Sequence, residues 1–159
     1  MPSPTSVHLR LAVETDAESV FNWRNAESTR RYFLDSRPLT LEAHLSWFRR
    51  VLINPAQILL IGETADHQPI GVLRYDLTPE GLAEVSIYVV PDQCGKGYGG
   101  ALLLAGERWL REAHPDVIAV EASVLSENIG SRKAFEKSGY SAALIRYRKS
   151  LDRAGGAAL

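Results

Sequence analysis

Four closely spaced glycines mark the stretch of the sequence best suited to chemistry. They are Gly95, Gly97, Gly99 and Gly100. They separate a strand pattern that ends at Pro91 from an amphipathic helical pattern that begins at Tyr98. Glycines let the backbone turn sharply, and the first turn of a helix has unpaired N–H donors at the positive end of its dipole. Such a turn is suited to binding phosphate or pyrophosphate.

Spacing excludes two common nucleotide-binding loops. A P-loop needs Gly-Lys followed by Ser or Thr, whereas Lys96 is followed by Gly97. A dinucleotide fingerprint G-x-G-x-x-G is not met either, because the glycines fall as G-x-G-x-G-G. A strand-to-helix turn that binds no ligand stays open as the alternative at this point.

A second candidate site lies near the N-terminus, where arginines and aromatic residues alternate. Arg24, Arg30 and Arg31 fall within residues 23–33. Guanidinium groups bind phosphates and stack on flat rings, so these residues could form an anion or substrate wall. Equally, they could be a solvated helix end. His44 and Trp47 lie on neighbouring faces of a later helical pattern and are further candidates for substrate contact, although a single histidine there is more often structural.

Composition limits the remaining possibilities. The chain has 159 residues, 45% of them hydrophobic, which suits one globular domain with its own core. A net charge of −1 gives no footprint for nucleic acid. One cysteine permits no intrachain disulfide, and the four histidines show no metal-binding spacing. We find no signal peptide and no apolar run of membrane-spanning length, so we expect a cytoplasmic protein with no membrane partner.

Periodicity predicts the elements that position these residues. The expected strands are 7–13, 57–64, 70–76, 85–89, 117–125 and 140–149. The expected helices follow a capping box at Thr15 and Glu18, a cap at Thr40, the glycine turn, and a cap at Asn128 or Ser126. Gly139 is placed for a left-handed exit from the last helix. We expect a domain over 1–150 and a flexible tail over 151–159.

Two motifs resemble a known family. Residues 94–99 resemble the Arg/Gln-x-x-Gly-x-Gly acetyl-CoA loop of the GNAT superfamily of N-acetyltransferases. Asn128-x-x-Ser131, followed by Phe135-x-Lys137-x-Gly139-Tyr140, resembles the second GNAT signature. The resemblance covers about residues 7–149. It implies an α/β (α+β) domain whose mixed, mostly antiparallel sheet is flanked by helices, with the central strand and the 117–125 strand splayed to admit pantetheine.

The resemblance also assigns coenzyme contacts residue by residue. Backbone amides near the loop would hold the pyrophosphate of acetyl-CoA, at Cys94, Gly95, Lys96, Gly97, Tyr98 and Gly99. Backbone groups of Ile87 and Val89 would pair with pantetheine. Asn128, Ser131 and Phe135 would flank the coenzyme. Cys94 departs from the usual Arg or Gln, and Phe135 stands where many members have a tyrosine that acts as general acid, which leaves open a coenzyme-A-binding module without catalysis.

Several short motifs resemble the acetyltransferases of amino-sugar nucleotides, nearest to the pseudaminic-acid-pathway type. They are residues 23–25, the pair Arg30-Arg31, His44 with Trp47, and residues 84–87. They are more loosely similar to those acting on ribosomal-protein N-termini. We therefore expect direct acetyl transfer to a primary amine on a nucleotide-linked amino sugar, without a metal, by a monomer or homodimer. The alternative acceptor is a protein α-amine or another small amine. Glu84 is the expected general base, and Tyr88 and Ser86 are candidate proton donors to the thiolate.

Overall fold

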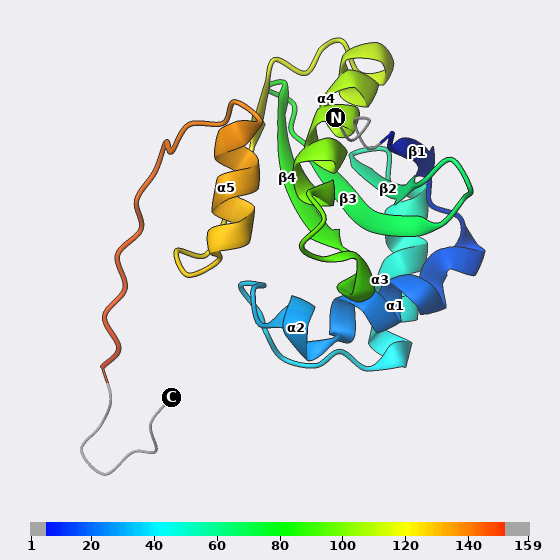
Figure 1. Ribbon diagram of the computed structural model, residues 1–159, viewed down its shortest axis with the longest axis horizontal. Helices are drawn as coiled ribbons and strands as arrows, with labels where there is room; N and C mark the ends of the chain where they lie inside the picture. Colours follow the sequence, from blue (N-terminus) through cyan, green and yellow to red (C-terminus); the bar gives the residue numbers. More distant parts are fainter. Residues whose placement is uncertain (1–5, 152–159) are drawn as a thin grey trace.

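A computed structural model describes residues 6–151 of the chain (Figure 1). The strands are β1 His8–Leu11, β2 Gln57–Glu63, β3 Pro69–Leu77, β4 Leu82–Val89 and β5 Ala119–Glu121. The helices are α1 Ala17–Asn25, α2 Glu27–Arg30, α3 Leu41–Ile53, α4 Tyr98–Ala113 and α5 Ile129–Lys137. Two short 3₁₀ turns, η1 Glu14–Asp16 and η2 Pro91–Gln93, precede α1 and the glycine loop. Within residues 6–151, no helix is both long and apolar enough to cross a membrane.

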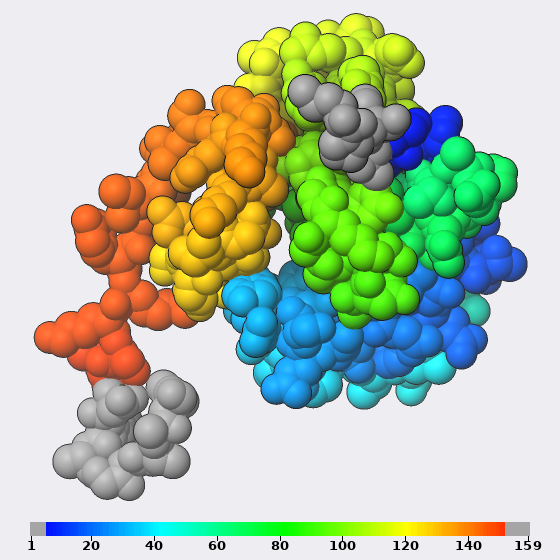
Figure 2. All heavy atoms as spheres, viewed as in Figure 1, coloured from blue at the N-terminus to red at the C-terminus, as the bar shows by residue number. Residues whose placement is uncertain are grey.

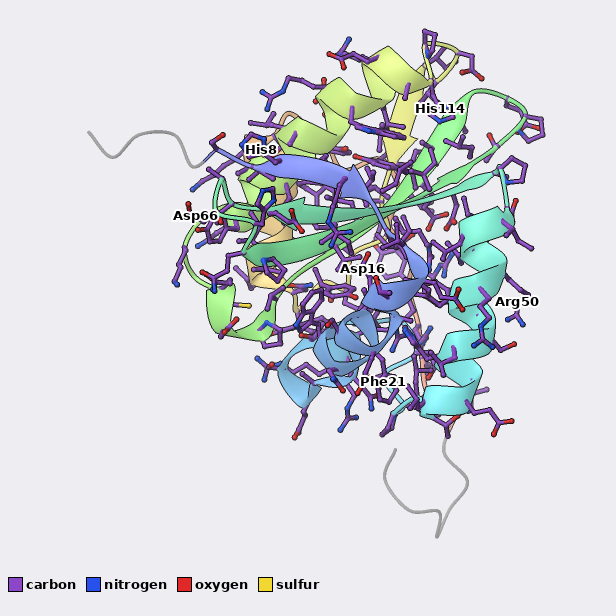
Figure 3. All side chains as sticks on the ribbon, turned by 90° about the vertical axis from the view of Figure 1, so that its right-hand side faces the viewer. His8, Asp16, Phe21, Arg50, Asp66 and His114 are labelled. Carbon is purple, nitrogen blue, oxygen red and sulfur yellow. The ribbon has the colours of Figure 1, made fainter. Side chains whose placement is uncertain are left out.

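The sheet has the strand order β1-β2-β3-β4-β5, and only its last pair, β4 with β5, is parallel. Residues alternate between its two faces, so each face has its own core. Leu73 and Tyr75 pack with Leu102 of α4 on one face. Val72 and Ile61 pack with Phe48 of α3 on the other. Figure 3 shows Phe21 on α1 and Arg50 on α3, with Asp16 where β1 leads into α1.

The last two strands separate soon after they pair. Leu82, Ala83 and Glu84 pair with Ala119, Val120 and Glu121. β4 continues to Val89, but among the described residues its pairing with β5 ends at Glu84. The expected splay of the central strands is therefore confirmed, and Glu84 lies at the fork.

Several expected helix ends are confirmed. Thr40 Oγ1 accepts a hydrogen bond from the Ala43 amide at 3.2 Å, and Asn128 Oδ1 accepts one from the Ser131 amide at 3.2 Å. Gly139 has φ 90°, and the Tyr140 amide donates to the Phe135 carbonyl at 3.0 Å. That 6→1 bond is the Schellman ending that glycine permits.

The capping box expected at Thr15 and Glu18 is wrong. Asp16 organises the start of α1 instead, because its carboxylate accepts hydrogen bonds from the Val13 amide and from the Arg10 guanidinium. Arg10 also donates to Glu63 on β2 at 2.7 Å. These bonds hold the pKa of Asp16 below its usual range and fix the end of β1 to its neighbouring strand.

The end of the chain also differs from the sequence expectation. The strand expected over 117–125 is only Ala119–Glu121, and the strand expected over 140–149 is absent from the described structure. After the turn at Gly139, residues 141–151 extend outside the body of the molecule (Figure 1). An alternating pattern gives a strand only where a neighbouring strand is available, and here the segment does not reach one. Of the expected tail 151–159, only Leu151 lies within the described residues.

Candidate active site

The glycine loop presents its backbone to open space. Gly95 and Gly97 adopt φ of 79° and 81°, a left-handed conformation that favours glycine. Gly97 is the residue that caps α4, so the free amides of the first helical turn follow immediately. A Cβ built on either glycine meets no protein atom within 4 Å. The loop therefore leaves room beside its amides for a phosphate group, as the pyrophosphate assignment requires.

The side chains of Cys94 and Lys96 contact neighbouring residues of the protein and do not converge on one binding site. The thiol of Cys94 lies 3.8 Å from the Val90 carbonyl, and Lys96 Nζ lies 3.1 Å from Gln93 Oε1. Gly99 faces α5, where a Cβ on it would lie 3.5 Å from Ala134. Binding at this loop would accordingly depend on backbone amides, with Lys96 as the nearby cation.

The free edge of β4 supplies a second set of backbone groups. The Val90 amide donates to the Ile70 carbonyl of β3 at 2.9 Å. Because backbone groups alternate along an antiparallel strand, those of Ile87 and Val89 point to the opposite side, where β5 has already diverged. This arrangement fits the expected pairing of Ile87 and Val89 with the pantetheine arm.

The residues of the second signature lie at and within α5, and the expected role of one of them, Phe135, is revised. Asn128 and Ser131 are half-buried in the first turn of α5. Phe135 is only 7% exposed, belongs to the core, and packs edge-to-face on Tyr140 with ring centroids 4.9 Å apart. Phe135 thus acts as a core residue of α5 rather than as a side chain lining the cleft. Figure 2 shows the surface hollowed between α5, in yellow and orange, and the green residues around η2 and the start of α4.

Arg24 is the central side chain of the N-terminal wall. It lies over the Phe33 ring, with Cζ 4.4 Å from the ring centroid. Its Nη1 is buried and has no hydrogen-bond partner among the described residues. Burial lowers the pKa of Arg24, and the positive charge of Arg74 contributes in the same direction. A buried guanidinium nitrogen without an acceptor is costly to leave unpaired, which marks Arg24 as a group able to receive an oxygen of a ligand.

The other candidates of this wall differ in their access to solvent: Arg30, Arg31 and Trp47 are exposed or half-buried, whereas His44 is buried. Arg30 donates to the Ser36 carbonyl at 3.1 Å, and exposed Arg31 stacks on Tyr32 at 4.7 Å. His44 is 1% exposed, and its Nε2 is 2.8 Å from the Ala17 carbonyl. Burial lowers the pKa of His44, so it is neutral and donates this bond. Its expected substrate contact is therefore revised to a structural role, whereas half-buried Trp47 retains access to solvent.

Three β4 side chains share one sheet face. Glu84 is exposed at the fork, half-buried Ser86 follows, and the Tyr88 hydroxyl donates to the Val20 carbonyl at 3.4 Å. Burial raises the pKa of Tyr88, so its hydroxyl stays protonated and able to donate through the neutral range. The strand thus places a carboxylate and a protonated phenol four residues apart on the same side of the open edge.

Sequence reasoning missed Arg74 and Phe33. Arg74 on β3 lies 3.5 Å from Ser86 Oγ and 3.1 Å from Asp76, and its guanidinium sits 5.8 Å from the Trp47 ring centroid. Phe33 contacts both Arg24 and Tyr88. A charged residue in the otherwise apolar run 70–75 was a possible signal for Arg74. Nothing in the sequence indicated which ring Arg24 would cover.

Two hollows stand out on the described surface, and neither is lined by Arg24, Arg30 or Arg31. One of about 380 Å³ lies along β5 and the end of α4, and one of about 280 Å³ lies between η1, α1 and α3. The described residues contain no group of three His, Cys, Asp or Glu side chains arranged to hold a metal ion.

Fold and loop together define an acetyl-coenzyme-A-dependent transferase. A family model described as an acetyltransferase (GNAT) domain matches residues 6–141. The chain therefore belongs to the GNAT acetyltransferases and is an acetyl-CoA-dependent N-acetyltransferase. No curated protein matches the sequence.

Solved structures share the fold at low sequence identity. Aminoglycoside acetyltransferase AAC(6')-Ib in complex with coenzyme A is 21% identical, with a TM-score of 0.74 over 86% of this chain and 84% of that one. Spermidine N-acetyltransferase from Vibrio cholerae, in complex with CoA and spermine, is 18% identical, with a TM-score of 0.76 over 84% and 79%. A domain from Methanocaldococcus jannaschii is 21% identical, with a TM-score of 0.75 over 87% and 90%.

Proposed function

We propose that this N-acetyltransferase acetylates the primary amine of a nucleotide-linked amino sugar. The observation that carries the proposal is the buried, unpartnered Nη1 of Arg24. An acceptor with a diphosphate offers the charged oxygen that this donor lacks, and a charge-assisted bond would offset the cost of burying it. Arg74 adds a second positive charge on the same side.

The coenzyme-binding part of the proposal rests on backbone geometry. The amides following Gly97 would hold the pyrophosphate, and the free edge at Ile87 and Val89 would align the pantetheine arm. Bound there, acetyl-CoA supplies the thioester that an amine attacks. Holding the two reactants in one orientation can account for much of the rate acceleration.

Glu84 is the proposed general base. An amine that arrives protonated cannot attack a thioester, and Glu84 is an exposed carboxylate at the fork where the coenzyme edge begins. A carboxylate that removes this proton directly or through one water would contribute roughly 10²–10⁴-fold. With Phe135 buried and lacking a hydroxyl, Tyr88 is the better placed donor to the departing thiolate, and Ser86 is the alternative.

One observation favours the second acceptor, a protein α-amine. Arg31 is exposed, and neither of the two hollows is lined by Arg24, Arg30 or Arg31, so the outer part of the arginine wall faces solvent. A solvent-facing wall suits an extended peptide. The known neighbours act on other amines, aminoglycosides and spermidine by their names.

The deciding experiment is an acceptor panel followed by release of free thiol. The panel contains a UDP-linked amino sugar, the same sugar without its nucleotide, a peptide with a free N-terminus, spermidine and an aminoglycoside. The proposal predicts the highest kcat/KM for the nucleotide-linked sugar and a clear drop when the nucleotide is removed. Equal kcat/KM for both sugars, or a preference for the peptide, would refute the nucleotide-sugar assignment.

A further inference from the structure

The connection between α1 and α3, residues 26–40, borders the arginine wall. In Figure 1 it leaves α1, forms the short helix α2 and runs along the lower edge of the molecule to α3. Ala26, with φ −57° and ψ 133°, interrupts the helical path between α1 and α2. Connections of this length inside a compact domain often serve function, because a rigid scaffold holds their ends.

The side chain of Asn25, the last residue of α1, closes this connection. Its Oδ1 accepts a hydrogen bond from the Leu39 amide at 2.8 Å, and its Nδ2 donates to the Leu39 carbonyl at 3.4 Å. A carboxamide presents an acceptor and a donor side by side, so one side chain satisfies both backbone groups of one residue. Within residues 6–151, no other hydrogen bond joins residues 31–39 to α1. We call these two bonds the Asn25 clamp.

Phe33 is the side chain through which the connection contacts the proposed acceptor side. Its ring lies 4.4 Å from the guanidinium carbon of Arg24 and meets the Tyr88 ring edge-on, with centroids 5.9 Å apart. A guanidinium over a ring face is attracted by the ring, which favours one orientation of the side chain. One ring thus contacts both the proposed anion-binding group and the proposed proton donor.

Bonds within the connection fix its shape but not its position over the sheet. The Phe33 amide donates to the Arg30 carbonyl at 3.0 Å, and Arg30 Nη1 donates to the Ser36 carbonyl at 3.1 Å. Donors and acceptors of these bonds all belong to the connection, so they can move together as a unit. The Asn25 clamp joins this unit to α1, and it thereby sets where Phe33 lies relative to Arg24.

We propose that Asn25 is a positioning residue for the acceptor: it holds the connection closed, and the connection holds Phe33 against Arg24 and Tyr88. This role rests on the proposed function, in which Arg24 contacts the acceptor. When the clamp is open, Arg24 can turn towards water, and an acceptor then has to order it on binding. The acceptor therefore binds more weakly. The glycine loop belongs to another part of the chain, and coenzyme affinity stays the same.

Hydrogen exchange of the free protein tests the clamp without any acceptor. Asn25→Ala removes both bonds, whereas Asn25→Asp keeps the side-chain size and the acceptor for the Leu39 amide but loses the donor. Asn22→Ala, at an exposed position of the same helix, is the matched control. We expect amides over residues 31–39 to exchange roughly tenfold faster in Asn25→Ala, less so in Asn25→Asp, and at the wild-type rate in Asn22→Ala.

Two results of the exchange measurement would overturn the proposal. One is exchange of residues 31–39 at the wild-type rate in both Asn25 variants. The other is loss of protection throughout the chain in both variants, because Asn25 would then support the whole fold rather than this connection. Unchanged exchange in α4 is the expected sign that the rest of the fold is kept.

Steady-state kinetics test the link from Asn25 to Phe33, with the amine of the acceptor panel that has the highest kcat/KM. Asn25→Ala and Phe33→Leu should each raise the acceptor KM by about tenfold and leave the KM for acetyl-CoA unchanged. Because both changes act through one ring, the double variant should show no larger rise than the larger single one. Additive effects, or an equal rise in the KM for acetyl-CoA, would contradict the positioning role.

Failure of this role can be told apart from failure of the proposed function. A preferred acceptor without a nucleotide would refute the nucleotide-sugar assignment. The exchange rates need no acceptor, and the double-variant comparison needs only one that is acetylated. Both would still decide the role of Asn25.

Discussion

The proposed coenzyme side and the proposed acceptor side of this protein are built on opposite principles. On the coenzyme side, the loop at Gly95 and Gly97 and the edge at Ile87 and Val89 offer backbone groups to open space. On the acceptor side, Arg24 is a side chain held against Phe33 from a neighbouring part of the chain. A backbone site depends on conformation and tolerates changes of side chain. A side-chain site depends on which residues the fold brings together, and single substitutions can change what it binds.

The fork at Glu84 joins the two sides, and it gives the largest expected effect. Glu84→Gln keeps shape and polarity but removes the proposed base, so turnover at neutral pH should fall by roughly 10²–10⁴-fold. Activity should partly recover at high pH, where the amine is already neutral, and coenzyme affinity should hardly change. The measurement is a pH–rate profile with coenzyme titration. Glu80→Gln, in the exposed turn before the same strand, is the matched control. Near-normal turnover of Glu84→Gln at every pH would place the base elsewhere.

The next largest effect is expected on coenzyme binding at the glycine loop. It tests whether binding depends on backbone conformation. Gly97→Val puts a β-branched residue at φ 81° and a bulky side chain where the phosphate approaches. Strain together with weakened charged hydrogen bonds should cost ~2–4 kcal/mol of coenzyme binding. Calorimetry on folded protein measures this loss. Cys94→Ser should bind within about twofold of the wild type, since the amide remains. Comparable losses from both changes would show that the Cys94 side chain matters as much as the loop conformation.

Arg24 tests the acceptor side in isolation. Arg24→Met keeps an apolar stem over Phe33 but removes the guanidinium, so the acceptor KM should rise by an amount corresponding to ~1.5–3 kcal/mol. The KM for acetyl-CoA should stay close to the wild-type value. Arg50→Met, which removes an exposed arginine of α3 outside the arginine wall, is the control. Steady-state kinetics with each substrate varied in turn measure the two KM values. An equal rise in both constants would indicate damage to the fold rather than loss of an acceptor contact.

His44 gives the smallest effect and concerns stability. Because burial lowers its pKa in the folded state, the unfolded chain binds the proton more readily as pH falls below 6.5. Stability from this group is therefore present above pH 6.5 and is lost progressively below it. Urea unfolding from neutral to mildly acidic pH should show this loss, and His44→Gln should flatten that part of the profile. A profile unchanged by the substitution would assign the acid sensitivity to other groups.

The glycine loop and several helix ends could be predicted because their determinants are local. The left-handed turns at Gly95 and Gly97, the caps at Thr40 and Asn128, and the exit at Gly139 each depend on residues a few positions apart. The strand predicted over 140–149 is absent because its formation depends on a distant part of the chain. It is a suitable strand sequence, but whether a strand forms depends on an edge that lies elsewhere in the molecule.

Residue type and short spacing were enough to predict the glycine loop, the family signatures and most of the order of elements as far as the last helix. Which candidate side chains meet became clear only from the folded chain. It buried His44 and Phe135 in the core, left Arg24 Nη1 without a partner among the described residues, and brought in Arg74 from β3. It also ended the pairing of β4 with β5 at Glu84, which places that carboxylate at the mouth of the open edge. Burial and long-range contact arise from packing of distant segments, and no local pattern specifies them.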